Sequence, residues 1–351
     1  MLHNLLLLAL GGGFSALLTR QLIGWCHRSG RLLYPRTDRW SRRTVAQFGG
    51  VPILIAWAGL TLVFASAGEQ MQVIVALALC MGAVGLADDI WRLSPSTKFA
   101  AQVLAATVAV IAGLSYPLGL HPALNVVFTM LWIVGLTNAF NLIDNMDGLS
   151  GGVAIIALVS IVLLMWGDAV IVPAGLIMVG ALLGFMVFNV SPARIFMGDT
   201  GSLGLGFFLA CISILSVQRM NYAASVPVLP VLVFFVPIFD TTLVSFTRRR
   251  GGRPIWVGAR DHSSHRLVLL GMSERQAVFT LYIFSAIGGL TAYLWKARPH
   301  FGGGLLAFFA LGAAWLWVYL AQLELPADWL SQPVDHDLPL AIGVKNEKEQ
   351  R

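Results

Sequence analysis

Five aspartates lie at the ends of apolar segments, where their carboxylates could hold a divalent cation beside a phosphate. Asp88 and Asp89 are adjacent in GLADDIW, Asp144 and Asp147 lie in NLIDNMDGL, and Asp199 lies in MGDTGS. Hard cations such as Mg²⁺ prefer oxygen ligands, and Mg²⁺ usually takes one or two carboxylates together with substrate phosphates. The set therefore indicates a metal-assisted reaction of a phosphate compound.

Glycines surround Asp199 and favour close contact between this backbone and a ligand. Gly198, Gly201 and Gly204 remove side chains from the stretch. The helix expected to begin here would offer free N–H groups to an anion. Adjacent aspartates on a helix point about 100° apart, so one member of the DD pair would meet the metal or a proton and the other a cation. The aspartates of NLIDNMDGL share a face if that stretch is helical.

Basic side chains gather in the stretch ARDHSSHR and just before it. His262 and His265 are three residues apart, and Arg253, Arg260 and Arg266 lie nearby. The histidines could form a metal-binding pair, but with three arginines beside them a cationic patch for phosphates is the favoured interpretation. A solvated basic loop that serves only membrane topology remains the alternative.

Another polar stretch, FNVSPARIFMGDTGS, contains Asn189, Arg194 and Phe196 ahead of the glycine-flanked aspartate. The ring of Phe196 could stack on a nucleotide base, as aromatic side chains commonly do. Taken alone, interfacial anchoring is the simpler interpretation of this phenylalanine.

These clusters stand among long apolar segments. The chain has 351 residues, of which 57% are hydrophobic and only 11% are charged, and its mean hydropathy is +0.78. Soluble domains are usually about 25% charged, so a large soluble enzyme is excluded. Spans of roughly 17 to 25 apolar residues predict helices near residues 3–23, 50–67, 70–87, 99–116, 122–139, 151–167, 169–188, 201–217, 226–246, 277–295 and 302–322.

The predicted fold is an all-α integral membrane protein, a polytopic bundle of about eleven transmembrane helices, with ten as the alternative count. Helices are required because lipid cannot satisfy backbone hydrogen bonds. Residues 1–322 form a single transmembrane domain, and residues 323–351 form a polar, mobile tail.

The distribution of basic residues predicts the orientation. If the first loop is cytoplasmic, all of the 23 Lys and Arg residues except Arg219, Lys296 and Arg298 lie on the inner side. This strong positive-inside pattern places the N-terminus outside and the C-terminus in the cytoplasm. The basic charge is then mostly a matter of topology, and a nucleic-acid partner has no support.

All of the polar clusters fall at cytoplasmic helix ends in this topology, which favours an enzyme facing the cytosol. An ion-coupled transporter would place ionisable groups near the membrane midplane and show an internal repeat. A polytopic scaffold without chemistry would be insensitive to changes in the acids. Both stay as alternatives from other functional classes.

The order of the motifs resembles the polyprenyl-phosphate N-acetylhexosamine-1-phosphate transferase superfamily, the MraY/WecA family. The motifs are the DD pair followed by SPSTK, then NLIDNMDGL, FMGDTGS and a histidine-bearing loop, within residues 5–320. The resemblance implies transfer of a sugar 1-phosphate from a UDP-sugar to undecaprenyl or another polyprenyl phosphate, with release of UMP. It implies Mg²⁺ as cofactor, with Mn²⁺ as a substitute, and location in the bacterial inner membrane. It leaves a homodimer open.

The resemblance also assigns roles to residues. The implied catalytic residues are Asp88, Asp89, Asp144, His262 and His265, the implied substrate-binding residues are Arg92, Lys98, Asn141, Asp147, Asn189, Arg194, Phe196 and Arg266, and the implied metal ligand is Asp199. In these assignments Asp88 is the position of a base. Asp147 and Phe196 lie at the uracil, and Arg92 and Lys98 lie near the phosphates.

Departures from the family pattern bear on the substrate. The histidine loop reads DHSSHR, whereas the transferase for UDP-MurNAc-pentapeptide carries three consecutive histidines. Eleven helices also favour the WecA-like branch. UDP-GlcNAc is therefore the expected donor, with a related UDP-N-acetylhexosamine close behind and the MurNAc-pentapeptide reaction as the alternative.

Overall fold

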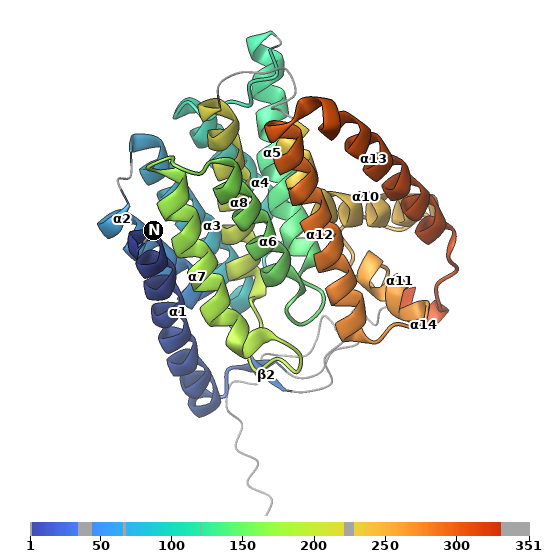
Figure 1. Ribbon diagram of the computed structural model, residues 1–351. Helices are drawn as coiled ribbons and strands as arrows, with labels where there is room; N and C mark the ends of the chain where they lie inside the picture. The colour runs from blue at the N-terminus through green and yellow to red at the C-terminus, as the bar shows by residue number, and fades with distance from the viewer. Residues whose placement is uncertain (1, 34–43, 66–67, 120, 221–227, 331–351) are drawn as a thin grey trace, which may run out of the picture.

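The computed structural model describes residues 2–33, 44–65, 68–119, 121–220 and 228–330. Its helices (Figure 1) are α1 Leu2–Ser29, α2 Gly50–Phe64, α3 Glu69–Trp91, α4 Pro95–Ile111, α5 Pro122–Ile143, α6 Leu149–Leu164, α7 Ile171–Asn189, α8 Gly198–Arg219, α9 Leu229–Val233, α10 Phe235–Arg250, α11 Ser263–Leu269, α12 Glu274–Ala297, α13 Pro299–Gln322 and α14 Ala327–Leu330. Two short strands, β1 Leu32–Leu33 and β2 Val45–Ala46, pair antiparallel.

The prediction of an all-α polytopic membrane protein is confirmed. In the described part of the chain, seven helices are long and apolar enough to cross a membrane, and α2, α4 and α6 are shorter apolar helices. Ten of the eleven predicted segments correspond to single helices. Of the predicted polar tail, residues 331–351 lie outside the described residues, as do residues 34–43 of the basic first loop.

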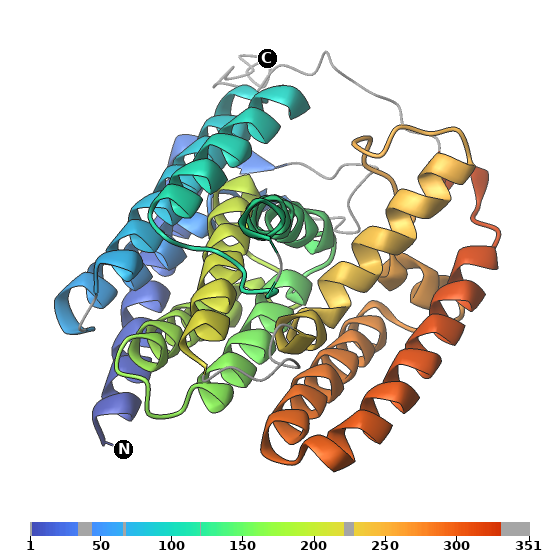
Figure 2. The same ribbon diagram turned by 90° about the horizontal axis from the view of Figure 1, so that it is seen from above.

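The predicted helix 226–246 is wrong as a single helix, because it is divided into α9 and α10 at Phe234. Pro237 has no N–H to donate to Val233, the last residue of α9, so the hydrogen-bond ladder stops there. Proline is tolerated in a first turn, whose N–H groups have no partner within the helix, and α10 begins two residues before Pro237. As a result, α10 runs across the direction of α12 (Figure 1), and α10, α12 and α13 form one flank (Figure 2).

Helix α8 occupies the centre of the bundle, and its most apolar window is completely buried. Two glycines allow neighbouring helices to pack against its first turn. A Cβ at Gly50 would collide with the backbone of Gly201, and a Cβ at Gly85 would collide with the backbone carbonyl of Asp199. Helices α2 and α3 therefore approach the start of α8 backbone to backbone, which fixes the position of Asp199.

Helix α4 begins with the SPSTK motif and lies at the edge of the bundle. The Thr97 backbone N–H donates to Ser94 Oγ at 3.1 Å, and Pro95 is the first helical residue. This is a typical helix start. Farther along, the amides of Gln102 and Asn138 donate to each other's oxygens, which ties α4 to α5. The cap and the amide pair together hold Lys98, in the first turn of α4.

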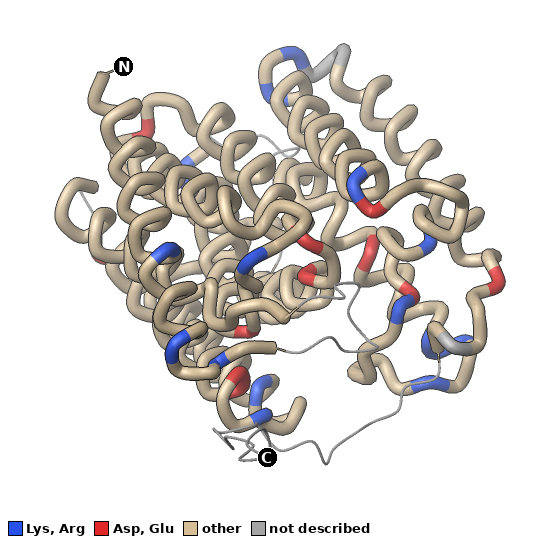
Figure 3. Tube along the Cα trace, turned by 90° about the horizontal axis from the view of Figure 1, so that it is seen from below, with Lys and Arg blue, Asp and Glu red and all other residues tan. Residues whose placement is uncertain are grey.

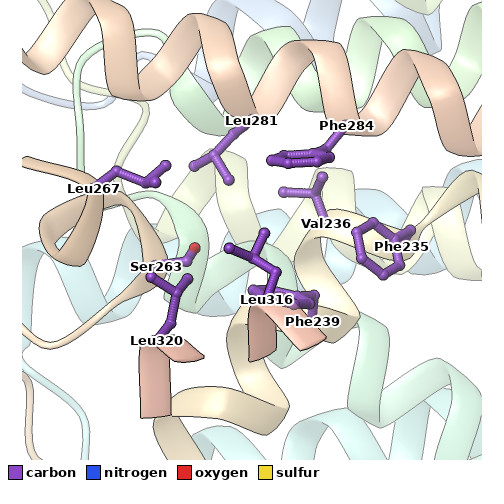
Figure 4. A pocket seen from close by; sticks show the side chains of 9 residues that line it. All are labelled: Phe235, Val236, Phe239, Ser263, Leu267, Leu281, Phe284, Leu316 and Leu320. Carbon is purple, nitrogen blue, oxygen red and sulfur yellow. The ribbon is translucent and has the colours of Figure 1, made fainter. Parts of the chain in front are cut away.

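The site end of the bundle is the end at which α3, α5 and α7 finish and α4, α6 and α8 begin. It is the lower end in Figure 1, and both acidic and basic segments are visible on it from below (Figure 3). A small apolar pocket, with room for little more than a water molecule, lies between α10, α11, α12 and α13 (Figure 4). Its lining is Phe235, Val236, Phe239, Ser263, Leu267, Leu281, Phe284, Leu316 and Leu320.

Candidate active site

Two carboxylates and a lysine meet at the centre of the site end. Lys98 Nζ lies 2.9 Å from Asp88 Oδ2 and 2.8 Å from Asp199 Oδ2. The three side chains come from the end of α3 and the starts of α4 and α8, and each remains between 15% and 23% exposed. The two carboxylates also contact each other. Such a pair is stable only beside positive charge, which the Lys98 ammonium supplies in this carboxylate–lysine centre.

Asn141 extends the carboxylate–lysine centre towards α5. Its Nδ2 donates to Ser202 Oγ at 2.9 Å, and its side chain is also a hydrogen-bonding neighbour of the Asp199 carboxylate. The sequence places Asn141 and Ser202 far apart, but α5 and α8 bring them together. Asn141 therefore joins the residues around Asp199.

Asp89 faces a different way from its neighbour Asp88. Its Oδ1 accepts from the Asp199 N–H at 3.0 Å, and its Oδ2 accepts from the Thr200 N–H at 3.0 Å and the Thr200 hydroxyl at 2.6 Å. Gly198 has a φ of +71°, and a Cβ there would lie 2.7 Å from Asp89 Oδ2. The Asp89 carboxylate therefore binds the exposed N–H groups of the first turn of α8, and of the two aspartates it is Asp88 that contacts a cation, Lys98.

The donor set at the carboxylate–lysine centre fits Mg²⁺ bound together with phosphates. In the described residues no cluster of three or more His, Cys, Asp or Glu side chains forms a metal cage. The carboxylates of Asp199 and Asp88 are hard oxygen donors at one place. Mg²⁺ usually takes one or two carboxylates and completes its shell with phosphates and water, so two carboxylates suffice.

The loop of residues 144–148 joins α5 to α6, and we call it the donor loop after the role that the family resemblance implies for its aspartates. Asp144 follows the last helical residue of α5, and Gly148 adopts a φ of +77°. The conditional expectation that Asp144 and Asp147 share a helical face is not met, since the stretch is a turn. Asp147 Oδ2 accepts from the Ala193 N–H at 2.9 Å, and the hydroxyl of Tyr282 donates to the Gly148 carbonyl at 2.5 Å.

Asn189 is buried and cross-links two loops. Its Oδ1 accepts from the Gly148 N–H at 3.1 Å, and its Nδ2 donates to the Ile195 carbonyl at 2.8 Å. The side chain predicted near the nucleotide therefore fixes the donor loop against the segment that leads into α8. Its contribution to substrate binding is indirect in this arrangement.

The remaining candidates around the carboxylate–lysine centre occupy the rim. Arg92 is exposed at the C-terminus of α3, and its N–H donates to the Asp88 carbonyl at 2.8 Å. Arg194 is exposed, with its guanidinium 4.8 Å from the centre of the Phe188 ring. The backbone of Phe196 pairs with Ala46 beside β2, at the start of α8. Arg92 and Arg194 are thus accessible to an anionic ligand, and Phe196 is half-buried.

The histidine helix, α11, is held from one side by Asp240 of α10. Asp240 Oδ1 accepts from the Ser263 N–H at 2.7 Å and its hydroxyl at 2.6 Å. Asp240 Oδ2 lies 2.7 Å from His262 Nδ1. His262 is nearly buried, at the N-terminus of α11. The carboxylate therefore fixes the imidazole as well as the helix start.

His265 does not supply positive charge to the site. Its side chain is completely buried. Burial, with a smaller effect from the neighbouring His262 and Arg260, lowers the pKa of His265 to about 3. The imidazole is therefore neutral near pH 7, and the expectation that both histidines belong to a cationic patch is wrong for this one.

Arg266 likewise does not face a phosphate. It is 1% exposed, and its guanidinium donates to the carbonyls of Asp261 at 2.9 Å and Leu320 at 2.6 Å and to Thr247 Oγ1 at 3.3 Å. The prediction that Arg266 binds substrate is wrong, because it cross-links α11 to α10 and α13 from inside the fold.

A second buried arginine supports the same region. Arg248 donates from Nε and a terminal nitrogen to the two oxygens of Asp261, at 3.0 and 2.8 Å. Burial alone would raise the pKa of Asp261, but the hydrogen bonds and charge of Arg248 outweigh it and lower that pKa. The loop before α11 is therefore organised around a bidentate ion pair.

We expect Arg266→Met to weaken the fold rather than donor binding. The change leaves buried carbonyls without a donor, which costs about 1–3 kcal/mol of unfolding free energy. Thermal unfolding in detergent should show a lower midpoint, with the KM for the donor unchanged in the folded fraction. Arg249→Met, at an exposed arginine one residue from Arg248, is the control for loss of charge. A raised donor KM with an unchanged midpoint would restore the sequence-based prediction.

The donor loop and α11 meet through residues that sequence reasoning did not select. Ser264 Oγ donates to Asn145 Oδ1 at 2.7 Å. Asn145 stands between the two aspartates of NLIDNMDGL, and Ser264 between the two histidines of DHSSHR. The sequence marks Asn145 and Ser264 only by their positions between candidate residues. Those positions do not predict that the two side chains, 119 residues apart, form a hydrogen bond.

Comparison with known proteins supplies the family. Residues 71–217 match the family model described as "Glycosyl transferase family 4". The chain is 34% identical over 275 residues to the "Probable undecaprenyl-phosphate N-acetylglucosaminyl 1-phosphate transferase" of Bacillus subtilis, a match that covers 75% of this chain and 76% of the relative.

Two further relatives carry different names. The chain is 32% identical over 350 residues to the "Decaprenyl-phosphate N-acetylglucosaminephosphotransferase" of Mycolicibacterium smegmatis, covering 87% of this chain and 83% of the relative. It is 31% identical over 278 residues to the "Phospho-N-acetylmuramoyl-pentapeptide-transferase" of Staphylococcus carnosus, covering 70% and 83%.

Proposed function

The chain belongs to glycosyl transferase family 4, and we propose that it transfers N-acetylglucosamine 1-phosphate from UDP-GlcNAc to undecaprenyl or another polyprenyl phosphate. UMP is released, and the lipid-linked diphosphate sugar begins a cell-envelope polysaccharide. The observation that carries the proposal is the similarity, over most of both chains, to relatives named for this reaction. The relative named for the muramoyl-pentapeptide reaction matches at lower identity and covers less of this chain.

The reaction joins two anions. An oxygen of the lipid phosphate attacks the sugar-bearing phosphorus of the donor, and the bond from that phosphorus to the bridging oxygen breaks, so that UMP departs with the bonding electrons. Positioning and electrostatic stabilisation dominate phosphoryl transfer. Lys98 at the centre and Arg92 and Arg194 at the exposed rim supply positive charge for the phosphates.

We assign the metal to Asp199, with Asp88 and Asn141 beside it. When bound, Mg²⁺ would neutralise the donor diphosphate and the charge that develops on UMP. Lys98 lies between the two carboxylates, so positive charge is already favoured at this position. The 2.9 Å contact with Lys98 fixes the Asp88 carboxylate at this centre. A phosphate monoester is mostly dianionic near pH 7, so Asp88 can act by orienting the lipid phosphate as well as by deprotonating it.

The donor loop completes the substrate assignment. Asp144 and Asp147 face the nucleotide-sugar from the turn between α5 and α6, with Phe196 near the uracil. The acceptor phosphate would stay at the site end while its hydrocarbon tail lies in the lipid around the apolar helices. The excess of basic residues at this end supports a cytosolic orientation in the inner membrane.

UMP release by the detergent-purified protein tests the proposal. We expect UMP only when undecaprenyl phosphate, Mg²⁺ and UDP-GlcNAc are all present, and none after chelation by EDTA until Mg²⁺ or Mn²⁺ is returned. UDP-GalNAc and UDP-MurNAc-pentapeptide are the matched alternative donors. UMP from the pentapeptide donor alone would replace the assigned sugar. Folded protein that releases UMP from no donor would contradict the proposed reaction. Full activity in EDTA would contradict the metal requirement.

A further inference from the structure

A hydrogen bond joins the donor loop to α11, two parts of the site that lie far apart in sequence. The Ser264 hydroxyl donates to Asn145 Oδ1 at 2.7 Å. Asn145 belongs to the donor loop, between Asp144 and Asp147, and Ser264 belongs to α11. We propose that Asn145 and Ser264 are positioning residues that set the donor loop against the histidine helix and thereby determine the affinity for the nucleotide-sugar. The inference rests on the proposed function.

The Asn145 side chain is fixed at both of its polar atoms. Its Nδ2 donates to the carbonyl of Leu142, in the last turn of α5, at 3.0 Å. Its Oδ1 is taken by Ser264. A short amide held at both ends has one conformation, and it transmits the position of α11 to the turn that carries Asp144 and Asp147.

Ser264 is equally well fixed on the other side. Its side chain is completely buried. The residue before it binds Asp240 through backbone and hydroxyl, and Arg266 binds the Leu320 carbonyl two residues later. Helix α11 is therefore anchored to α10 and α13, and the Ser264 hydroxyl is a rigid donor pointing at the donor loop.

The opposite wall of the donor loop is already held without this bond. Asn189 binds the Gly148 N–H, Ala193 binds Asp147, and Tyr282 binds the Gly148 carbonyl. These contacts fix the second half of the loop, from Asp147 to Gly148. The bond from Ser264 acts on the first half, beside Asp144. Loss of the bond should therefore disturb the placement of Asp144 while the loop as a whole stays folded.

The test compares Ser264→Ala, Asn145→Ala and the double variant by steady-state UMP release. One hydrogen bond contributes about 0.5–1.5 kcal/mol, and tenfold in affinity corresponds to about 1.4 kcal/mol. We expect each single variant to raise the KM for UDP-GlcNAc about 3- to 10-fold, with the KM for undecaprenyl phosphate unchanged. Both changes remove the same bond. The donor KM of the double variant should therefore lie within about twofold of that of the more impaired single variant.

Ser213→Ala is the matched control. Ser213 is a fully buried serine of α8 whose hydroxyl binds Trp132 Nε1 at 3.0 Å. It lies about 21 Å along the helix from Asp199 at 1.5 Å per residue. If Ser264 were only structural, the two serine variants would lower the unfolding midpoint alike and leave the donor KM alone.

The outcomes separate the two proposals. Wild-type protein that releases no UMP from any donor would overturn the proposed function. Active wild type with an unchanged donor KM in both single variants, or equal rises in donor and acceptor KM, would overturn this inference alone. If Ser264→Ala does not fold, Asn145→Ala in the half-exposed donor loop carries the test by the same criterion. The positioning contact is supported if only the donor KM rises and if the effects of the two single changes do not multiply in the double variant.

Discussion

Replacing Asp199 by asparagine is expected to abolish lipid-dependent UMP release, with a fall in kcat of about 10²–10³-fold or more, the range seen when a preorganised electrostatic group is lost. The carboxylate sits at the first turn of α8, 2.8 Å from Lys98 and in contact with Asp88. Asparagine keeps the volume and one oxygen but removes the charge that favours a divalent cation. Binding of Mn²⁺, followed by electron paramagnetic resonance with UDP-GlcNAc present, should weaken in parallel with turnover.

Asp168→Asn is the control for the Asp199 change. Asp168 lies between α6 and α7, at the other end of the bundle, where it accepts from the N–H groups of Val170 and Ile171 and pairs with Arg219. Burial raises its pKa, but these hydrogen bonds outweigh burial and lower it. Asparagine there should cost some stability and leave kcat near that of the wild type. Full activity of Asp199→Asn, or equal losses in both variants, would refute the metal assignment.

The sequence was sufficient for the helices but not for the break in the ninth apolar segment. Length and hydropathy identify a span, because every apolar stretch of about twenty residues must satisfy its backbone as a helix in lipid. The division at Phe234 depends on Pro237 and on the helices against which α10 packs, α5, α12 and α13. Proline kinks one helix and ends another according to its neighbours, so the direction of α10 could not be derived from composition.

The sequence predicted the location of the site residues better than it predicted what each side chain contacts. The motifs marked Asp88, Lys98, Asn141 and Asp199, and the structure brings all four together. Motif membership, however, says nothing about which way a side chain points. Charged residues were expected to face ligand, because burying a charge is costly unless it is paired and hydrogen-bonded.

Asp89 and Arg266 show how that expectation fails. Asp89 finds the N–H groups of α8, a partner that exists only because α3 and α8 pack through Gly85. Arg266 finds the carbonyls at the end of α13, more than fifty residues away. Both side chains satisfy their charge with backbone groups brought from other helices. Such partners cannot be identified from a motif, since they depend on the packing of the whole bundle.

Lys98→Met is expected to reduce kcat/KM about 10²-fold, and the way in which it does so will identify what the lysine binds. In the present arrangement its ammonium contacts both Asp88 and Asp199, at 2.9 and 2.8 Å. Without it the two carboxylates repel each other and the phosphates lose a cation. Lys98→Arg should recover only part of the loss, because the planar guanidinium cannot replace a compact point charge.

Adding Asp88→Asn to Lys98→Met distinguishes the two roles of the lysine. If Lys98 serves only to neutralise the carboxylate pair, the double variant should be as active as Asp88→Asn alone. If Lys98 contacts the substrate phosphates, which we expect because its side chain is 23% exposed at the centre of the site, the double variant should be less active than Asp88→Asn. Unfolding midpoints near that of the wild type must accompany either result. A kcat/KM of Lys98→Met equal to that of the wild type would show that Lys98 has no part in the reaction, because a cation that neutralises two carboxylates beside a reacting diphosphate could not be dispensable.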